Sequence, residues 1–108
     1  SKLTSETKPK EKQSIAKLKK VFEHTTRVEI TALLNPSSNL VTLETLDQPA
    51  LLSQVAYIFY ENGINVISSR ITTLGEKVED NFLVVDARKN IQISKNKEEQ
   101  VIKKLKNL

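Results

Sequence analysis

The side chains best placed to bind a ligand flank the start of a predicted helix. Thr45 and Asp47 end an extended segment, and Asn65 begins the next one after the helix. A helix N-terminus offers free backbone amides to a carboxylate, and Asp47 offers a carboxylate to an ammonium group. Together these groups predict a polar notch that suits a zwitterionic metabolite. The leucines beside them are equally typical of a capped core helix that holds no ligand.

The sequence contains no set of residues with the spacing of a catalytic site. His24 is the only imidazole and there is no Cys, so a metal site would have to consist of carboxylates alone. Glu79 and Asp80 are adjacent on a predicted strand and therefore point to opposite faces. Gly63 and Gly75 are the only glycines, and neither stands in a phosphate-binding loop. We expect this chain by itself to perform no chemistry and to hold no metal or cofactor.

The composition is that of one small domain with a basic N-terminal segment. The chain has 108 residues and a formal net charge of +4, and residues 1–22 contain seven Lys against two Glu. Residues 23–108 are nearly neutral, so we expect one domain there, preceded by a basic linker. An apolar stripe between residues 11 and 22 leaves open a short amphipathic helix. The start at Ser1 suggests a fragment excised from a longer protein.

The same composition argues against several classes of partner. With Tyr not counted as apolar, the longest apolar run has four residues, which is too short for a spanning helix or a signal-peptide core. The predicted strands carry one aromatic residue, Phe82, so bases would find no platform to stack on, and we expect no nucleic-acid binding. The absence of Cys excludes disulfides and fits a reducing cytoplasm.

Two β-hairpins are predicted from the alternation of apolar residues. The first joins strands 27–34 and 40–46 through turn residues 35–39. The second joins strands 64–74 and 77–86 through the two residues Gly75-Glu76, which fixes its register. Because Ile64 and Val66 alternate out of step with Ile67 and Ile71, we expect a bulge near Ile67. The partners predicted on one shared face are Ile67 with Val84, Ser69 with Phe82, and Ile71 with Asp80.

One helix is expected after each hairpin. The first is capped by Asp47, has Pro49 in its first turn and stops at Gly63. The second starts at Asn96, with Glu99 three residues later as in a capping box. Their apolar faces comprise Leu51, Leu52, Val55, Ile58 and Phe59 in the first helix and Val101, Ile102, Leu105 and Leu108 in the second.

This order of elements predicts an α+β fold, a two-layer ferredoxin-like sandwich whose antiparallel sheet carries both helices on one face. Ferredoxin-like folds normally close with a strand after the second helix, whereas this sequence ends directly after that helix. We expect the extra N-terminal strand 27–34 to replace the missing strand, in the vacant place beside strand 40–46.

Two stretches resemble ACT domains, the small ligand-sensing modules of enzymes that respond to amino acids. The first is LDQPALL at 46–52 with NGINV at 62–66, a pattern general to ACT domains. The second is SRITTLGEKVEDNF at 69–82. It resembles one subgroup, the C-terminal ACT domain of the bifunctional uridylyltransferase/uridylyl-removing enzymes that act on the nitrogen regulatory protein P-II. The similarity runs from about residue 22 to residue 108 and implies an ACT domain over 23–108.

The resemblance implies a parent enzyme with a nucleotidyltransferase and an HD-type phosphohydrolase domain, using Mg²⁺ and UTP, followed by two ACT domains. Such an enzyme attaches UMP to P-II when glutamine is scarce and removes it when glutamine is plentiful, with the ACT region as the glutamine sensor. This chain would be the terminal ACT domain with the linker that precedes it. The ligand-binding positions carried over from the motif are Thr45, Asp47, Gln48, Ala50, Leu51 and Asn65.

One residue departs from the pattern of the family. ACT loops usually read Asp-x-Pro-Gly-Leu-Leu, and Ala50 stands in place of that Gly. Ala adds a methyl group and disfavours positive φ. If the loop keeps an ordinary φ, Ala50 only narrows the notch; if ligand binding requires Gly at this position, Ala50 prevents binding. Two functions therefore stay open. The chain is a regulatory domain that senses glutamine, or it is a structural module that pairs with another ACT domain, in the same parent chain or in a homodimer, without binding a ligand itself.

Overall fold

The computed structural model of the chain describes residues 26–108. The expected basic linker, the amphipathic helix at 11–22 and His24 lie outside these residues. Each hairpin is followed by a helix, as predicted. The elements are β1 (Arg27–Leu34), β2 (Ser37–Leu46), α2 (Leu51–Glu61), β3 (Ile64–Leu74), β4 (Lys77–Asp86) and α3 (Lys95–Lys106).

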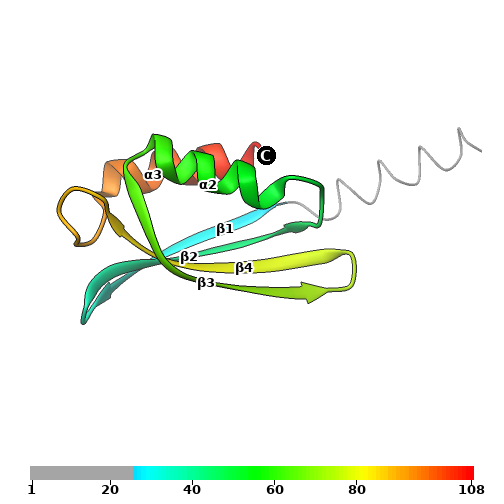
Figure 1. Ribbon diagram of the computed structural model, residues 1–108, viewed down its shortest axis with the longest axis horizontal. Coiled ribbons are helices and arrows are strands. Elements are labelled where there is room, and N and C mark those ends of the chain that lie inside the picture. Colours follow the sequence, from blue (N-terminus) through cyan, green and yellow to red (C-terminus); the bar gives the residue numbers. More distant parts are fainter. Residues whose placement is uncertain (1–25) are drawn as a thin grey trace, which may run out of the picture.

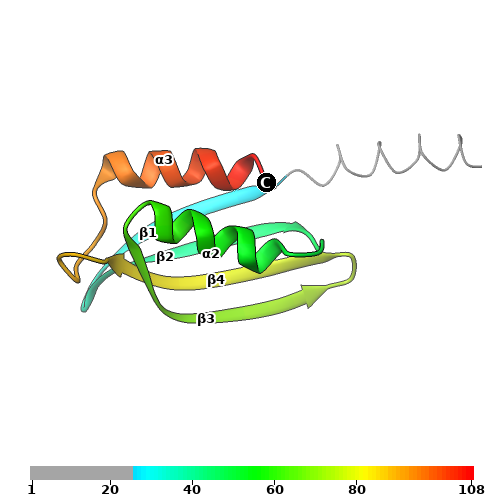
Figure 2. The same cartoon turned by 45° about the horizontal axis from the view of Figure 1, so that its top comes forward.

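The four strands form one antiparallel sheet in the order β1-β2-β4-β3. Both helices lie on the same face of this sheet, α3 over β1 and α2 over the β3 side (Figures 1 and 2). The predicted two-layer α+β sandwich is confirmed, and the architecture is ferredoxin-like. The extra strand β1 pairs with β2, so it occupies the place that the sequence left vacant.

The hydrophobic core fills the space between the sheet and the two helices. Phe59 of α2 and Phe82 of β4 meet edge to face, with ring centroids 5.2 Å apart. Burial of each such large side chain contributes about 1.5–3 kcal/mol, so these contacts fix α2 against the middle of the sheet. The buried core residues are Val28, Val41, Leu43, Leu51, Val55, Ile58, Phe59, Ile64, Val78, Phe82, Val84, Ile93, Val101 and Leu105.

The second hairpin has the predicted two-residue turn and most of the predicted register. Leu74 pairs with Lys77, and Ile71 pairs with Asp80. The register shifts between Val66 and Ser68, so the bulge expected near Ile67 is confirmed. The predicted pair of Ile67 with Val84 is wrong, because the bulge removes Ile67 from the ladder and Val66 takes its place.

The first hairpin is tighter than predicted, because β2 begins at Ser37 and only Asn35 and Pro36 form the turn. Ser38 and Asn39 were read as turn residues but are buried within the strand. Asn39 accepts a hydrogen bond from the backbone N–H of Ile93 at 2.8 Å and donates to Glu98 Oε2 at 3.2 Å. These partners lie far along the chain, so local sequence could not reveal them.

The last helix begins at a different cap from the one predicted. Ser94 is the N-cap residue, and its hydroxyl accepts a hydrogen bond from the backbone N–H of Lys97 at 3.2 Å. Asn96 lies in the first turn, so the capping box with Glu99 is wrong. Ser94 and Asn96 both have a short polar side chain and are followed by helix-forming residues. In the structure the helix begins after Ser94.

Candidate functional site

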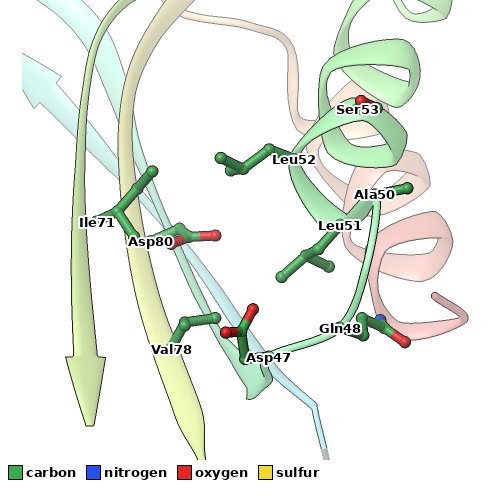
Figure 3. A pocket seen from close by; sticks show the side chains of 9 residues that line it. All are labelled: Asp47, Gln48, Ala50, Leu51, Leu52, Ser53, Ile71, Val78 and Asp80. Atoms are coloured by element: carbon green, nitrogen blue, oxygen red, sulfur yellow. The ribbon is translucent and has the colours of Figure 1, made fainter.

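A cavity of about 210 Å³ opens between the start of α2 and strands β3 and β4. It lies at the end of the sheet where β2 leads into the helix (Figure 3). Apolar side chains form most of its walls, and two carboxylates project into it. The lining residues are Asp47, Gln48, Ala50, Leu51, Leu52, Ser53, Ile71, Val78 and Asp80.

The loop before α2 is held from both sides. The backbone N–H of Asp47 donates to the carbonyl of Glu76 at 3.0 Å, which ties the loop to the β3–β4 hairpin. The N–H of Leu51 donates to the carbonyl of Gln48 at 3.3 Å and closes a turn over Pro49 and Ala50. The prediction that Asp47 caps the helix is wrong. Ala50 is the N-cap residue, and no side chain caps α2.

Ala50 adopts a left-handed backbone conformation with φ 62°. A turn with Pro at its second position and positive φ at its third is the type that normally takes Gly at that third position. The loop therefore adopts a conformation that normally takes Gly, at a cost of about 1–2 kcal/mol for the Cβ of Ala50. In Figure 3 the methyl group points away from the strands, so it does not fill the cavity. Narrowing of the notch was expected only for an ordinary φ at this position, which Ala50 does not adopt.

The first turn of α2 presents backbone donors at the edge of the cavity. Within residues 26–108 the amides of Leu52 and Ser53 have no hydrogen-bond acceptor, as expected for the first amides of a helix. No acidic residue lies in the first turn. The partial positive charge of this helix end is therefore available to an anionic group in the cavity.

Asp80 is the least expected residue of the site. Its side chain points from β4 toward the helix start in Figure 3, and the residue is only 1% exposed. Neither carboxylate oxygen has a hydrogen-bond partner within the described residues. Burial, followed by the nearby charge of Asp47, raises the pKa of Asp80 above its ordinary value. The cavity thus holds a carboxyl group that the protein leaves unsatisfied.

The structure brings together four of the six positions expected to bind ligand. Asp47, Gln48, Ala50 and Leu51 all line the cavity, although the Gln48 side chain extends away from the two carboxylates (Figure 3). Thr45 is buried but does not line the cavity, because its hydroxyl hydrogen-bonds that of Thr26 at 2.8 Å.

Asn65 lies at the opposite end of the sheet, which corrects the expectation of a single notch containing it. Strands β2 and β3 both run antiparallel to β4, so their last residues, Leu46 and Leu74, pair with the same residue, Lys77. Asn65 pairs with Val85, near the beginning of β2. It is also exposed and alternates with the core residue Ile64, so its side chain points to the helix-free face.

Sequence reasoning overlooked Asp80 as a site residue, although it contained the necessary signal. The predicted hairpin register already placed Asp80 opposite Ile71 on the face that the helices cover. A carboxylate on a core-facing strand position requires a partner, and the sequence offers no neighbouring cation on that face. Leu52 was also misplaced, since it is half-exposed beside the cavity instead of buried with the rest of the apolar face.

Two further properties of residues 26–108 bear on the kind of site. No three His, Cys, Asp or Glu side chains gather closely enough in this range to hold a metal ion. None of the helices described is long and apolar enough to cross a membrane.

Comparisons with known proteins extend these observations. No protein-family model matches the chain. The bifunctional uridylyltransferase/uridylyl-removing enzyme of Psychrobacter sp. is 38% identical over 72 residues, 67% of this chain. The enzyme of the same name from Acinetobacter baylyi is 45% identical over 65 residues, 58% of this chain. That of Psychrobacter arcticus is 50% identical over 50 residues, 46% of this chain.

The matched segments make up 6% to 8% of these relatives, so the chain spans less than a tenth of their length. All three relatives carry the name of an enzyme with two activities, as the resemblance of residues 69–82 implied. That resemblance is confirmed: the chain is similar to a short segment of the bifunctional uridylyltransferase/uridylyl-removing enzymes.

Proposed function

We propose that this chain is a regulatory ACT domain of a bifunctional uridylyltransferase/uridylyl-removing enzyme and that it senses an amino acid, glutamine. The observation that carries the proposal is the cavity at the start of α2, where a carboxylate faces an uncapped helix N-terminus. The relatives supply the enzyme class, and the ferredoxin-like fold with an added strand supports the ACT assignment.

The cavity suits a small zwitterion. Its volume of about 210 Å³ is below the roughly 300–1,000 Å³ of sites for drug-sized ligands. The ammonium group of an amino acid meets Asp47, and its α-carboxylate meets the free amides of Leu52 and Ser53. The walls formed by Leu51, Val78 and other apolar residues reduce the competition from water.

Catalysis belongs to other parts of such an enzyme. The nucleotidyltransferase domain, which uses Mg²⁺ and UTP to attach UMP to P-II, and the phosphohydrolase domain, which removes it with water, both act in the cytoplasm and lie outside the sequence similar to this chain. Glutamine regulates them if it binds one arrangement of the ACT region more tightly than another, because only a difference in affinity shifts an equilibrium. The partner of this chain is then the preceding ACT domain or a second copy.

Isothermal titration of the 108-residue chain with glutamine tests the proposal. We expect saturable binding to the wild type and at least about tenfold weaker binding to Asp47→Ala, because a charged hydrogen bond is lost. Asn65→Ala is the matched control, since Asn65 lies at the other end of the sheet. Saturable binding that survives Asp47→Ala but fails in Asn65→Ala would place the ligand elsewhere, and no binding by the wild type would contradict the glutamine proposal.

The edge strand β3 favours a second candidate function, the pairing of ACT domains. β3 is an uncovered edge of the sheet, eleven residues long, with Arg70 as its single charge. The other edge, β1, is protected by charges, because Arg27 forms ion pairs with Glu29 and Glu44. A long edge with few charges is a template for adding another strand.

Sedimentation of the chain with and without glutamine separates the two functions. A dimer that forms regardless of glutamine and is broken by Ile67→Lys supports pairing, because Ile67 is 55% exposed on the β3 edge. Leu34→Lys is the control, since Leu34 is 88% exposed on the β1 edge. A monomer at all concentrations, or equal effects of the two variants, contradicts pairing through β3.

A further inference from the structure

Asp80 is a buried carboxyl group with no partner among the described residues. Native proteins rarely leave such a group unsatisfied, because its lost interactions with water must be replaced. It is not enclosed in the core, since it lines the cavity and points into it (Figure 3). Its two oxygens have almost no exposed surface, so a ligand reaches them when the half-exposed Leu52 and Ile71, which line the same cavity, move aside.

The elements packed around Asp80 offer it no positive charge. α2 contributes Leu51 and Leu52, and β3 contributes Ile71, all of them apolar. β2 contributes Leu43, its partner across the sheet. The one charged residue that shares the cavity is Asp47, which carries the same sign. Within residues 26–108 the protein thus assembles two carboxyl groups around a space and supplies no cation for them.

We propose that Asp80, with Asp47, is the receptor for the ammonium group of the ligand, and that Asp80 makes the site select compounds with an amino group over the same acids without one. This inference rests on the proposed function, because it concerns the same cavity. It adds which side chains recognise the ammonium group of the ligand. Asp47 and Asp80 bind the cationic end of the ligand, whereas the helix amides bind the anionic end.

The arrangement also couples binding to a proton. Burial and the charge of Asp47 raise the pKa of Asp80, so the empty site favours its neutral form over a range above its ordinary value. An arriving ammonium group stabilises the carboxylate instead. Asp80 then releases its proton to solvent, and the ligand keeps its own. Affinity for an ammonium ligand therefore increases as the pH rises through the pKa of the empty site.

The test compares glutamine with glutaramate, which is glutamine without its α-amino group. We expect the wild-type chain to bind glutamine at least about 100-fold more tightly, because a site that leaves polar groups unpaired rejects the analogue. In Asp80→Asn the preference should fall below about tenfold, through weaker glutamine binding and unchanged or stronger glutaramate binding. A merely structural role of Asp80 would weaken both ligands alike.

Proton release provides a second readout that needs no variant. Titrations in two buffers with different ionisation enthalpies, from about pH 4 to about pH 8, should show a proton released by the wild type on binding glutamine. Asp80→Asn should release none. Glu79→Gln is the matched control, because the neighbouring Glu79 alternates to the opposite face and should leave both readouts unchanged.

Each outcome bears on one of the two proposals. If the wild type binds glutamine but binds glutaramate equally well, or releases no proton, the inference about Asp80 is overturned and the glutamine site remains. If no standard amino acid binds, both proposals are overturned. Stabilisation by Mg²⁺ that glutamine does not displace would also overturn the inference, because the carboxylates would then serve a metal ion.

Discussion

The two ends of α2 have similar residues near them but differ in whether the nearby aspartate has hydrogen-bond partners. At each end a residue has positive φ, Ala50 with 62° and Gly63 with 65°. At each end strand β4 also places an aspartate on the face covered by the helices, Asp80 at the first end and Asp86 at the second. We call the first the cavity end and the second the closed end.

The closed end satisfies its aspartate completely. Asp86 accepts hydrogen bonds from the backbone N–H groups of Arg88 at 2.9 Å and Lys89 at 3.1 Å, and from Lys97 Nζ at 3.2 Å. The Arg88 amide, then Lys97 and Lys89, lower the pKa of Asp86, whereas burial raises that of Asp80. Strand β4 thus carries one carboxylate that is hydrogen-bonded within the protein and one that has no partner among the described residues. The difference shows that the unsatisfied Asp80 is a local feature of the cavity end.

The largest expected effect comes from breaking the closed end. Asp86→Ala removes three hydrogen bonds that join β4, the following loop and α3. We expect a clear fall in the melting temperature measured by circular dichroism. Asp86→Asn keeps an acceptor for the two backbone amides and should recover part of the loss. An unchanged melting temperature in Asp86→Ala would show that the closed end does not depend on this carboxylate.

Replacing the aspartate at the cavity end should stabilise the protein instead of destabilising it. Asp80→Leu replaces an unsatisfied buried carboxyl group by an apolar one, with the cavity beside it to receive the larger side chain. Without ligand we expect the free energy of unfolding at neutral pH to rise by about 1–3 kcal/mol. Urea denaturation measures the change, with Glu79→Gln as the control. Destabilisation by Asp80→Leu would mean that Asp80 supports the fold as Asp86 does, and would contradict the difference drawn between the two aspartates.

The positive φ of Ala50 gives a smaller effect. Ala50→Gly removes the strain of a Cβ in the left-handed region and should raise the free energy of unfolding by about 0.5–1 kcal/mol. Ala56→Gly, in the middle of α2, should lower it by about 1 kcal/mol because Gly is a poor helix former. If both variants are destabilising to the same extent, Ala50 is not strained.

The smallest effect is the pH dependence, in which the two aspartates have opposite signs. Asp86 has a lowered pKa, so its stabilisation is present above the ordinary value of 3.8 and is lost as the pH falls through its folded-state pKa. Asp80 has a raised pKa, so the protein is more stable below 3.8 and loses that stability as the pH rises through the folded-state value. Between about pH 3 and pH 7, the difference in unfolding free energy between Asp80→Leu and wild type should therefore increase. A difference that is constant across this range contradicts the raised pKa.

The sequence predicted the architecture well because the fold depends on local patterns. Alternation gave three of the four strand starts, and Gly75 fixed the turn of the second hairpin. The errors occurred where a distant partner decides the structure. Asn39 was read as a turn residue because its partners, Ile93 and Glu98, are more than fifty residues away.

The candidate site was only partly predictable. The motif placed Asp47, Ala50 and Leu51 correctly around one loop, because they are neighbours in sequence. Asn65 was misplaced because β2 and β3 end together, at Lys77, so that the beginning of β3 lies at the other end of the sheet. The positive φ of Ala50 has no signal in its own side chain and emerges only when the turn over Pro49 is built.

The added strand β1 determines where the rest of the polypeptide joins the domain. Arg27 pairs with Glu44, and Thr26 hydrogen-bonds Thr45, two residues before Asp47. The covalent connection to everything N-terminal thus arrives at the cavity end. The described part of the chain therefore begins at the same end of the sheet as Asp47 and the cavity, and not at the closed end where Asp86 is satisfied.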